Sequence, residues 1–148
     1  MAKSAPCSIA STLVDIKVDA YVHLVRTADK AFADVSRGLN EHNLTASQFS
    51  ALKALCVKGP MPQKDVASSI LKSTGNVTLV IDNLERRGLV LRTRGVSDRR
   101  VFDIAVTESG RDLFESIYAA HLDRIRAEMS SLEPAECEQL IALLERIG

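Results

Sequence analysis

The strongest constraint on the fold of this chain is a helical pattern that passes directly into two β-like runs joined by an arginine-rich turn. The apolar residues of the helix recur at the i, i+3, i+4 and i+7 spacing that buries one face, and they are Val77, Val80, Ile81 and Leu84. Gly88 follows and supplies the left-handed residue that commonly ends a helix. A short helix with a polar outer face, joined to a basic hairpin, can address both grooves of a duplex. The segment therefore predicts a sequence-specific DNA-binding protein.

The hairpin is predicted from two β-like runs, residues 89–93 and 101–106, with Gly95 on the turn side between them. Asp98 stands two residues before Arg100 and could orient its guanidinium through a bidentate pair. An arginine that enters a narrow minor groove gains from the negative potential concentrated there. The alternative is a solvated surface ion pair, which contributes under ~1 kcal/mol. The arginines around the hairpin are Arg92, Arg94, Arg99 and Arg100.

Three further helices are predicted before this segment. Apolar residues recur at helical spacing over residues 9–41, which indicates one long helix. Thr45 and Gln48 have the spacing of a capping box and begin a second helix, which ends before Gly59. A third, short helix is expected over residues 61–71, with a proline in its first turn.

The fourth helix is expected over about residues 74–87, Thr107 caps a fifth, and Pro134 opens the last. The order of elements is then α, α, α, α, β, β, α, α. This order defines a mainly helical fold with a small β-hairpin, a winged helix-turn-helix core flanked by terminal helices. We expect a single domain over residues 1–148, with a DNA-binding lobe at 45–106 and dimerisation helices at 9–41 and 107–147.

Composition and charge agree with this interpretation. The 148 residues suit one domain with a hydrophobic core, and an aromatic content of only 4% favours aliphatic helix packing. The net charge is zero, but residues 1–106 contain 15 Lys and Arg against 10 Asp and Glu, and residues 107–148 contain 4 against 9. A basic centre beside an acidic C-terminal part provides the local attraction that phosphates need. The neutral total therefore does not exclude DNA.

Several other classes of protein are not indicated. No apolar run approaches the ~20 residues that span a bilayer, and no secretory signal precedes the first helix, so we expect a cytoplasmic protein without a membrane partner. The cysteines show no CxxC spacing and the histidines no metal-ligand spacing, so no metal or cofactor is expected. Cys56 reads as a small buried hydrophobe, and a redox role of Cys7 is left open.

The fourth helix carries the residues expected to face base edges in the major groove, with Asn able to pair with adenine and Thr able to contact thymine. These candidates are Ser73, Thr74, Asn76, Thr78 and Asn83. The alternative for the first two is that they only cap the helix, although a capping residue can also contact a phosphate. Arg86, Arg94 and Arg99 are further candidates for DNA contact.

With these features, the chain resembles the MarR family of winged helix-turn-helix regulators. The matching pieces occur in family order and with family spacing, and the resemblance covers roughly residues 13–147. They are residues 44–48 (LTASQ), 63–67 (QKDVA), 82–90 (DNLERRGLV), 98–100 (DRR) and 106–110 (VTESG).

The resemblance implies a homodimer with one recognition helix and one wing in each subunit. Asp98 and Arg100 match the wing-tip pair, with Arg100 in the minor groove, and phosphate contacts are implied for Gln63, Lys64 and Lys72. The chain departs from the family at Leu79 and Asn83, where many members carry cations.

The dimer is also expected from the residues alone, because the first and the last two helices carry more apolar surface than a small winged-helix core can cover. Two-fold symmetry would place the recognition helices roughly 34–36 Å apart, which predicts a palindromic operator in double-stranded DNA.

The family further implies a small, often phenolic or aromatic, effector held between the dimer helices and the DNA-binding lobe. Tyr21, His23, Arg26 and Asp29 on the first helix are available to contact it, and the alternative is an ordinary solvated face.

The sequence thus predicts a dimeric transcriptional regulator, a repressor released by an effector. One alternative is a winged-helix protein-interaction module without DNA binding, suggested by Leu79 and the neutral total charge. An enzyme is not expected, because no Ser/His/Asp order, glycine-rich phosphate loop or paired-carboxylate site emerges.

Overall fold

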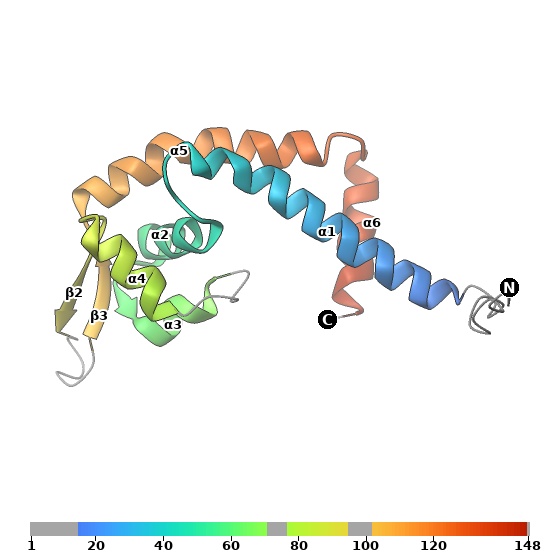
Figure 1. The fold of residues 1–148 in the computed structure, drawn as a ribbon. Coiled ribbons are helices and arrows are strands. Elements are labelled where there is room, and N and C mark those ends of the chain that lie inside the picture. Colours follow the sequence, from blue (N-terminus) through green and yellow to red (C-terminus); the bar gives the residue numbers. More distant parts are fainter. Residues whose placement is uncertain (1–14, 71–76, 95–101, 148) are drawn as a thin grey trace, which may run out of the picture. The chain divides into compact units, whose positions relative to one another are not determined.

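The fold is mainly helical with one small sheet (Figure 1), as predicted for a winged helix-turn-helix protein. The computed structural model describes residues 15–70, 77–94 and 102–147. In chain order the elements are α1 (Ile16–Asn40), α2 (Ala46–Lys58), β1 (Met61–Pro62), α3 (Gln63–Ser68), α4 (Val77–Arg86), β2 (Val90–Arg94), β3 (Phe102–Val106), α5 (Glu108–Glu128) and α6 (Pro134–Glu145). In the part of the chain that these ranges cover, no helix combines the length and apolarity needed to cross a bilayer.

The chain divides into two compact units, residues 1–34 and 35–148. The first contains most of α1, and the second contains the last turns of α1 and all other elements. The expected start of the first helix at residues 9–14 lies outside the described residues. The predicted division into a lobe at 45–106 and dimerisation helices stays a prediction.

The sheet differs from the predicted hairpin because it has a third strand. The order is β1-β3-β2, with β3 in the middle and both of its neighbours antiparallel to it. Met61 pairs with Ile104 and Pro62 with Asp103, whereas residues 61–62 were expected to open the third helix. That expectation was wrong, since α3 begins at Gln63. A two-residue strand shows no alternation in the sequence, and proline is tolerated there because the strand lies at the edge of the sheet.

The third helix is also shorter than the expected 61–71. It ends at Ser68, and the backbone N–H of Ser69 donates to the carbonyls of Val66 and Ala67. The fourth helix, expected over about 74–87, is described from Val77 to Arg86. Its predicted residues 74–76 lie outside the described ranges.

Local capping signals placed other helix ends correctly. The backbone N–H of Gln48 donates to Thr45 Oγ1 at 3.2 Å, and the N–H of Thr45 donates to Gln48 Oε1 at 2.9 Å, which completes the capping box of α2. Gly88 has φ 69°, the left-handed conformation predicted for the end of α4. The Thr107 hydroxyl accepts from the N–H of Gly110 at 3.1 Å and caps α5.

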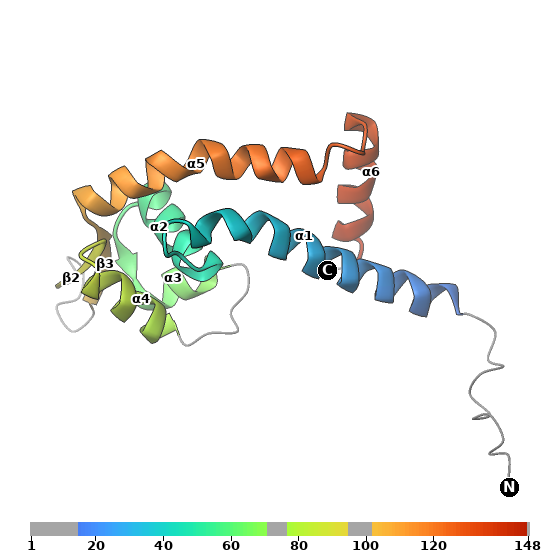
Figure 2. The same cartoon turned by 45° about the horizontal axis from the view of Figure 1, so that its top comes forward.

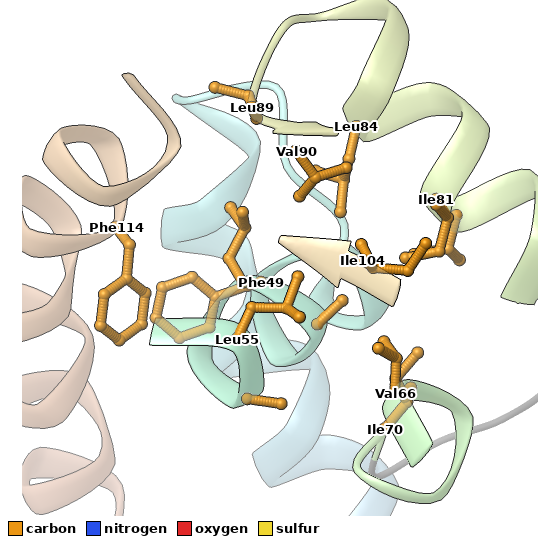
Figure 3. Packing of buried hydrophobic residues seen from close by; sticks show 14 of the residues in the cluster. Phe49, Leu55, Val66, Ile70, Ile81, Leu84, Leu89, Val90, Ile104 and Phe114 are labelled. Atoms are coloured by element: carbon orange, nitrogen blue, oxygen red, sulfur yellow. The ribbon is translucent and has the colours of Figure 1, made fainter. Parts of the chain in front are cut away.

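The core surrounds α2, which packs against α3, α4, α5 and β3. Figure 3 shows side chains from these elements meeting in one cluster, with the rings of Phe49 and Phe114 side by side; their centroids are 5.4 Å apart. The predicted buried stripe of α4 is confirmed for Val80, Ile81 and Leu84, while Val77 is half-buried. Cys56, expected to be buried, is half-buried against the edge of the cluster.

The start of α5 is joined tightly to the end of α4. The backbone N–H of Thr107 donates to the Leu89 carbonyl at 3.1 Å, and its hydroxyl donates to the Gly88 carbonyl at 2.7 Å. One turn later a Cβ added to Gly110 would lie 2.0 Å from the Leu89 carbonyl oxygen. Gly110 therefore allows a close backbone approach that no other residue type permits.

Substitution of Gly110 by alanine is expected to lower the free energy of unfolding by about 2–3 kcal/mol, because the clash is with backbone that can move only together with the strand. Urea denaturation at a fixed protein concentration measures the change. Ser109→Ala, at the exposed neighbouring position, is the control and should stay within about 0.5 kcal/mol of the wild type. A Gly110→Ala protein as stable as this control would show that the approach is not tight.

His121 on α5 lies where α5 packs on α2. Its ring contacts Phe49, with centroids 4.4 Å apart, and its buried Nδ1 has no hydrogen-bond partner among the described residues. Burial lowers the pKa of His121, and the positive charges of Lys53 on α2 and Arg124 on α5 lower it further. Arg124 itself is 3.8 Å from a carboxylate oxygen of Glu41. The neutral ring is thus the form that this packing favours.

Because the pKa of His121 is lower in the folded chain than its ordinary value of about 6.5, the unfolded chain binds the proton more readily. This contribution to stability is present above about pH 6.5 and is lost as the pH falls through the folded pKa. His121→Phe should flatten the fall in unfolding free energy below that pH, measured by urea denaturation at several pH values. His23→Phe, at an exposed position of α1, should keep it; a His121→Phe profile that matched the wild type would contradict the assignment.

Candidate nucleic-acid interface

The candidate interface comprises the outer face of α4, the start of α3 and the strand β2, which lie side by side in Figure 1. The described residues among the predicted DNA contacts are Gln63, Lys64, Thr78, Asn83, Arg86 and Arg94. The others lie outside the described ranges, so their roles stay predictions: Lys72, Ser73, Thr74, Asn76, Asp98, Arg99 and Arg100.

Two of the predicted residues connect α3 to α4. The side-chain amide of Gln63, the first residue of α3, donates to the hydroxyl of Thr78 in the first turn of α4 at 2.9 Å. Lys64 is exposed beside them. Because Val66 and Ile81 are fully buried below, the two helices are held both by apolar packing and by this polar contact. The structure thus brings Gln63, Lys64 and Thr78 to one surface.

The outer ridge of α4 consists of Leu79, Asn83 and Arg86, at i, i+4 and i+7 on the side away from the core. Arg86 Nη1 donates to Asn83 Oδ1 at 3.1 Å. The Asn83 oxygen is therefore engaged within the helix, and the amide presents its N–H groups outward. The guanidinium is held against the helix in the same way.

Arg92 differs from the other arginines of the hairpin. Its Nη2 lies 2.5 Å from Asp82 Oδ1, its Nη1 donates to Glu85, and its side chain is only 26% exposed. The hydrogen bond to Asp82 raises the pKa of the guanidinium, against the opposing effect of burial. Arg92 therefore clamps β2 to α4 and is not a free cation for DNA. Arg92 lies on the same hairpin strand as Arg94, as expected, but its two carboxylate partners could not be inferred from that position.

Arg87 is likewise committed to the protein. Its guanidinium donates to the carbonyls of Asn43 at 2.6 Å and His42 at 3.1 Å, in the turn after α1. Asn43 has φ 52°, a left-handed conformation that Asn tolerates better than most residues. Arg86, the last residue of α4, faces outward, and Arg87, which follows it, anchors the end of the helix. Sequence reasoning missed both anchors, although the carboxylates at positions 82 and 85 were a possible signal for the first.

Arg94 is an exposed cation at the end of β2. It pairs across the sheet with Phe102, whose side chain is 53% exposed, and it forms no ion pair with any residue in the described ranges. With Arg92 neutralised by two carboxylates, the described positive charge of this face comes from Lys64, Arg86 and Arg94.

The residues predicted to contact an effector lie on α1 in the first unit. Tyr21 is 66% exposed and Arg26 is exposed, and His23 lies 3.5 Å from the carboxylate of Asp19. Their contact with an effector stays a prediction. No group of three or more metal-ligating side chains occurs within the ranges that the structure describes.

The fold and this face together define a winged helix-turn-helix protein. The family model "MarR family" matches residues 44–102. The HTH-type transcriptional regulator YkoM of Bacillus subtilis is 35% identical over 136 residues, covering 89% of this chain and 88% of the relative. MhqR of the same organism, also an HTH-type transcriptional regulator, is 32% identical over 114 residues, or 77% and 79% of the two chains. This chain belongs to the MarR family, whose members are transcriptional regulators and not enzymes.

A solved complex of MepR from Staphylococcus aureus with DNA has a similar fold. Its TM-score is 0.74 at 26% sequence identity, and the match covers 86% of this chain and 95% of that chain. The likeness extends beyond residues 44–102 to most of the chain.

The clamp of Arg92 has a measurable consequence. Arg92→Met keeps the aliphatic packing but leaves Asp82 and Glu85 without a cation. We expect this substitution to lower the free energy of unfolding by about 1 kcal/mol. The loss is not larger because both carboxylates are partly exposed and therefore screened by solvent. Arg94→Met, at an exposed position on the same strand, should change it by less than about 0.5 kcal/mol. Urea denaturation of both variants makes the comparison, and equal effects would contradict the separation of the two roles.

Proposed function

We propose that this chain is a dimeric, sequence-specific DNA-binding repressor that a small aromatic effector releases from a palindromic operator. One observation carries the proposal. The helix α4 keeps the polar Asn83 and the cationic Arg86 on its outer face, and Arg92 holds the hairpin to this helix. Membership of a family of HTH-type regulators supports it. The likeness to a protein solved in complex with DNA supports it as well.

In this proposal α4 lies in the major groove and the hairpin reaches the adjacent minor groove. Residues 86–100 contain six arginines and one aspartate, so the segment stays basic even with Arg87 and Arg92 committed to the protein. Lys64 and Gln63 are proposed to contact the phosphate backbone at the start of α3, and Arg94, Arg99 and Arg100 to provide the charge of the wing.

The dimer is supported by apolar surface on both units. No residue of α6 is buried in the described chain, and its exposed side chains include Ile141 at 56% and Leu143 at 54%. Figure 2 shows α6 turning away from the end of α5. On α1, in the first unit, Ile16 is 73% and Tyr21 66% exposed. Surfaces of this kind mark association sites, and the symmetry of a homodimer would pair two recognition helices with a palindrome.

The effector is the third part of the proposal. A small aromatic compound would contact Tyr21 through its ring, and Arg26 or His23 through a phenolate or carboxylate oxygen. Such a ligand acts only if it binds one dimer geometry better than another, and the favoured geometry would separate the recognition helices from successive major grooves. Release of the operator is then the expected response.

The test is binding to a palindromic duplex from the promoter region of the gene that encodes the chain, titrated at several salt concentrations. The wild type should bind with two chains per duplex, and log Kd should rise steeply with log salt. Arg94→Ala and Arg100→Ala should each weaken binding and reduce the salt slope by about two per dimer, since each removes one phosphate-region cation from both subunits.

Arg126→Ala is the matched control, because this arginine is exposed on α5 and pairs with Asp123 at 2.7 Å. It should keep the wild-type slope. Absence of salt-sensitive binding to any duplex would contradict the proposal and favour a winged-helix module that binds another protein.

A further inference from the structure

Leu79 is an exception on the outer ridge of α4. The other two residues of the ridge, Asn83 and Arg86, are polar, and so is the neighbouring exposed residue Thr78. Leu79 is apolar, yet it is 55% exposed. The core does not need it, since the apolar stripe of Val80, Ile81 and Leu84 covers the opposite side of the helix.

The position of Leu79 decides what it can touch. It lies in the first turn of α4, two residues after Val77, and the N-terminal part of a recognition helix is the part nearest to base edges. Asn83 follows one turn later on the same ridge and is already bonded to Arg86. A ligand that approaches this ridge therefore meets an apolar group first and hydrogen-bond donors one turn further along.

We propose that Leu79 selects a thymine in each operator half-site through the C5-methyl group that thymine displays in the major groove. The inference rests on the proposed function, because it assumes that α4 occupies that groove. A leucine side chain has no hydrogen-bond donor or acceptor, so it cannot satisfy the polar edge of guanine or cytosine. The thymine methyl is the one methyl group that the four bases present there.

Burial of the leucine against this methyl removes apolar surface of both partners from water. Cytosine at the same place would offer no methyl and would leave its amino group without an acceptor from the helix. The donors of Asn83 then face the next base pair, where they favour an acceptor edge. Leu79 and Asn83 thus form an ordered pair of contacts along one strand.

The experiment begins with duplexes selected by the full-length chain from a random-sequence pool. In a selected duplex each thymine is replaced singly by uracil, which removes only the methyl group and keeps the base pairing. One thymine in each half-site should be sensitive, and its replacement should weaken wild-type binding about fourfold, the factor that burial of one methyl-sized group provides. In Leu79→Ala the same replacement should change Kd by less than about 1.5-fold, because the contact is already absent.

The matched control is Val57→Ala, which removes another exposed aliphatic side chain, on α2 and outside the candidate interface, and should retain the wild-type sensitivity to uracil. Circular dichroism of both variants checks that they fold, which their surface positions favour. If no uracil replacement affects the wild type, or if Leu79→Ala keeps the same sensitivity, the assignment of Leu79 is wrong while the DNA-binding proposal stands. If the pool yields no salt-sensitive duplex at all, both fail together.

Discussion

The rest of the structure depends on the burial of α2. This helix contacts α3, α4, α5 and β3, and its Ala51, Leu52 and Leu55 are almost fully removed from water. Because each neighbour must turn its apolar stripe toward α2, the opposite face of each is presented to solvent. The outer ridge of α4 is a consequence of this packing. The surface proposed to bind DNA is therefore positioned by the core beneath it, and Ile81 and Leu84 matter to it as much as the residues that face outward.

Electrostatics then divides the arginines of the α4–β2 segment into two groups. Arg92 and Arg87 are bonded to carboxylates or backbone carbonyls of the protein, while Arg86 and Arg94 remain at the surface. The first group gives up charge that would attract phosphates, and in exchange it holds the hairpin and the end of α4 in place. A protein that recognises a duplex sequence needs both groups of arginines. Attraction to phosphates provides affinity, whereas a defined geometry of helix and wing places the protein in one register on the base pairs.

Helix ends were predictable because their causes lie within a few residues. The capping box of Thr45 and Gln48, the left-handed Gly88 and the Thr107 cap each depend on one turn of backbone and on side chains at known spacing. The third strand was not predictable in the same way, because Met61 and Pro62 become a strand only by pairing with β3, about forty residues later in the chain. Asp82 and Glu85 are only ten and seven residues from Arg92, but they lie on a different element, so their contact with Arg92 depends on how β2 packs against α4.

The sequence by itself determined the class of fold, the order and most of the boundaries of the helices, and the family, because periodicity, caps and motif spacing are local properties of the chain. Tertiary structure decided which charges serve the protein and which are available to a partner. It also decided that Leu79 stands at the surface of the recognition helix with polar neighbours around it. The physical reason is that the partners of a side chain are set by which helix faces meet across the core, and those contacts join residues that are far apart in sequence.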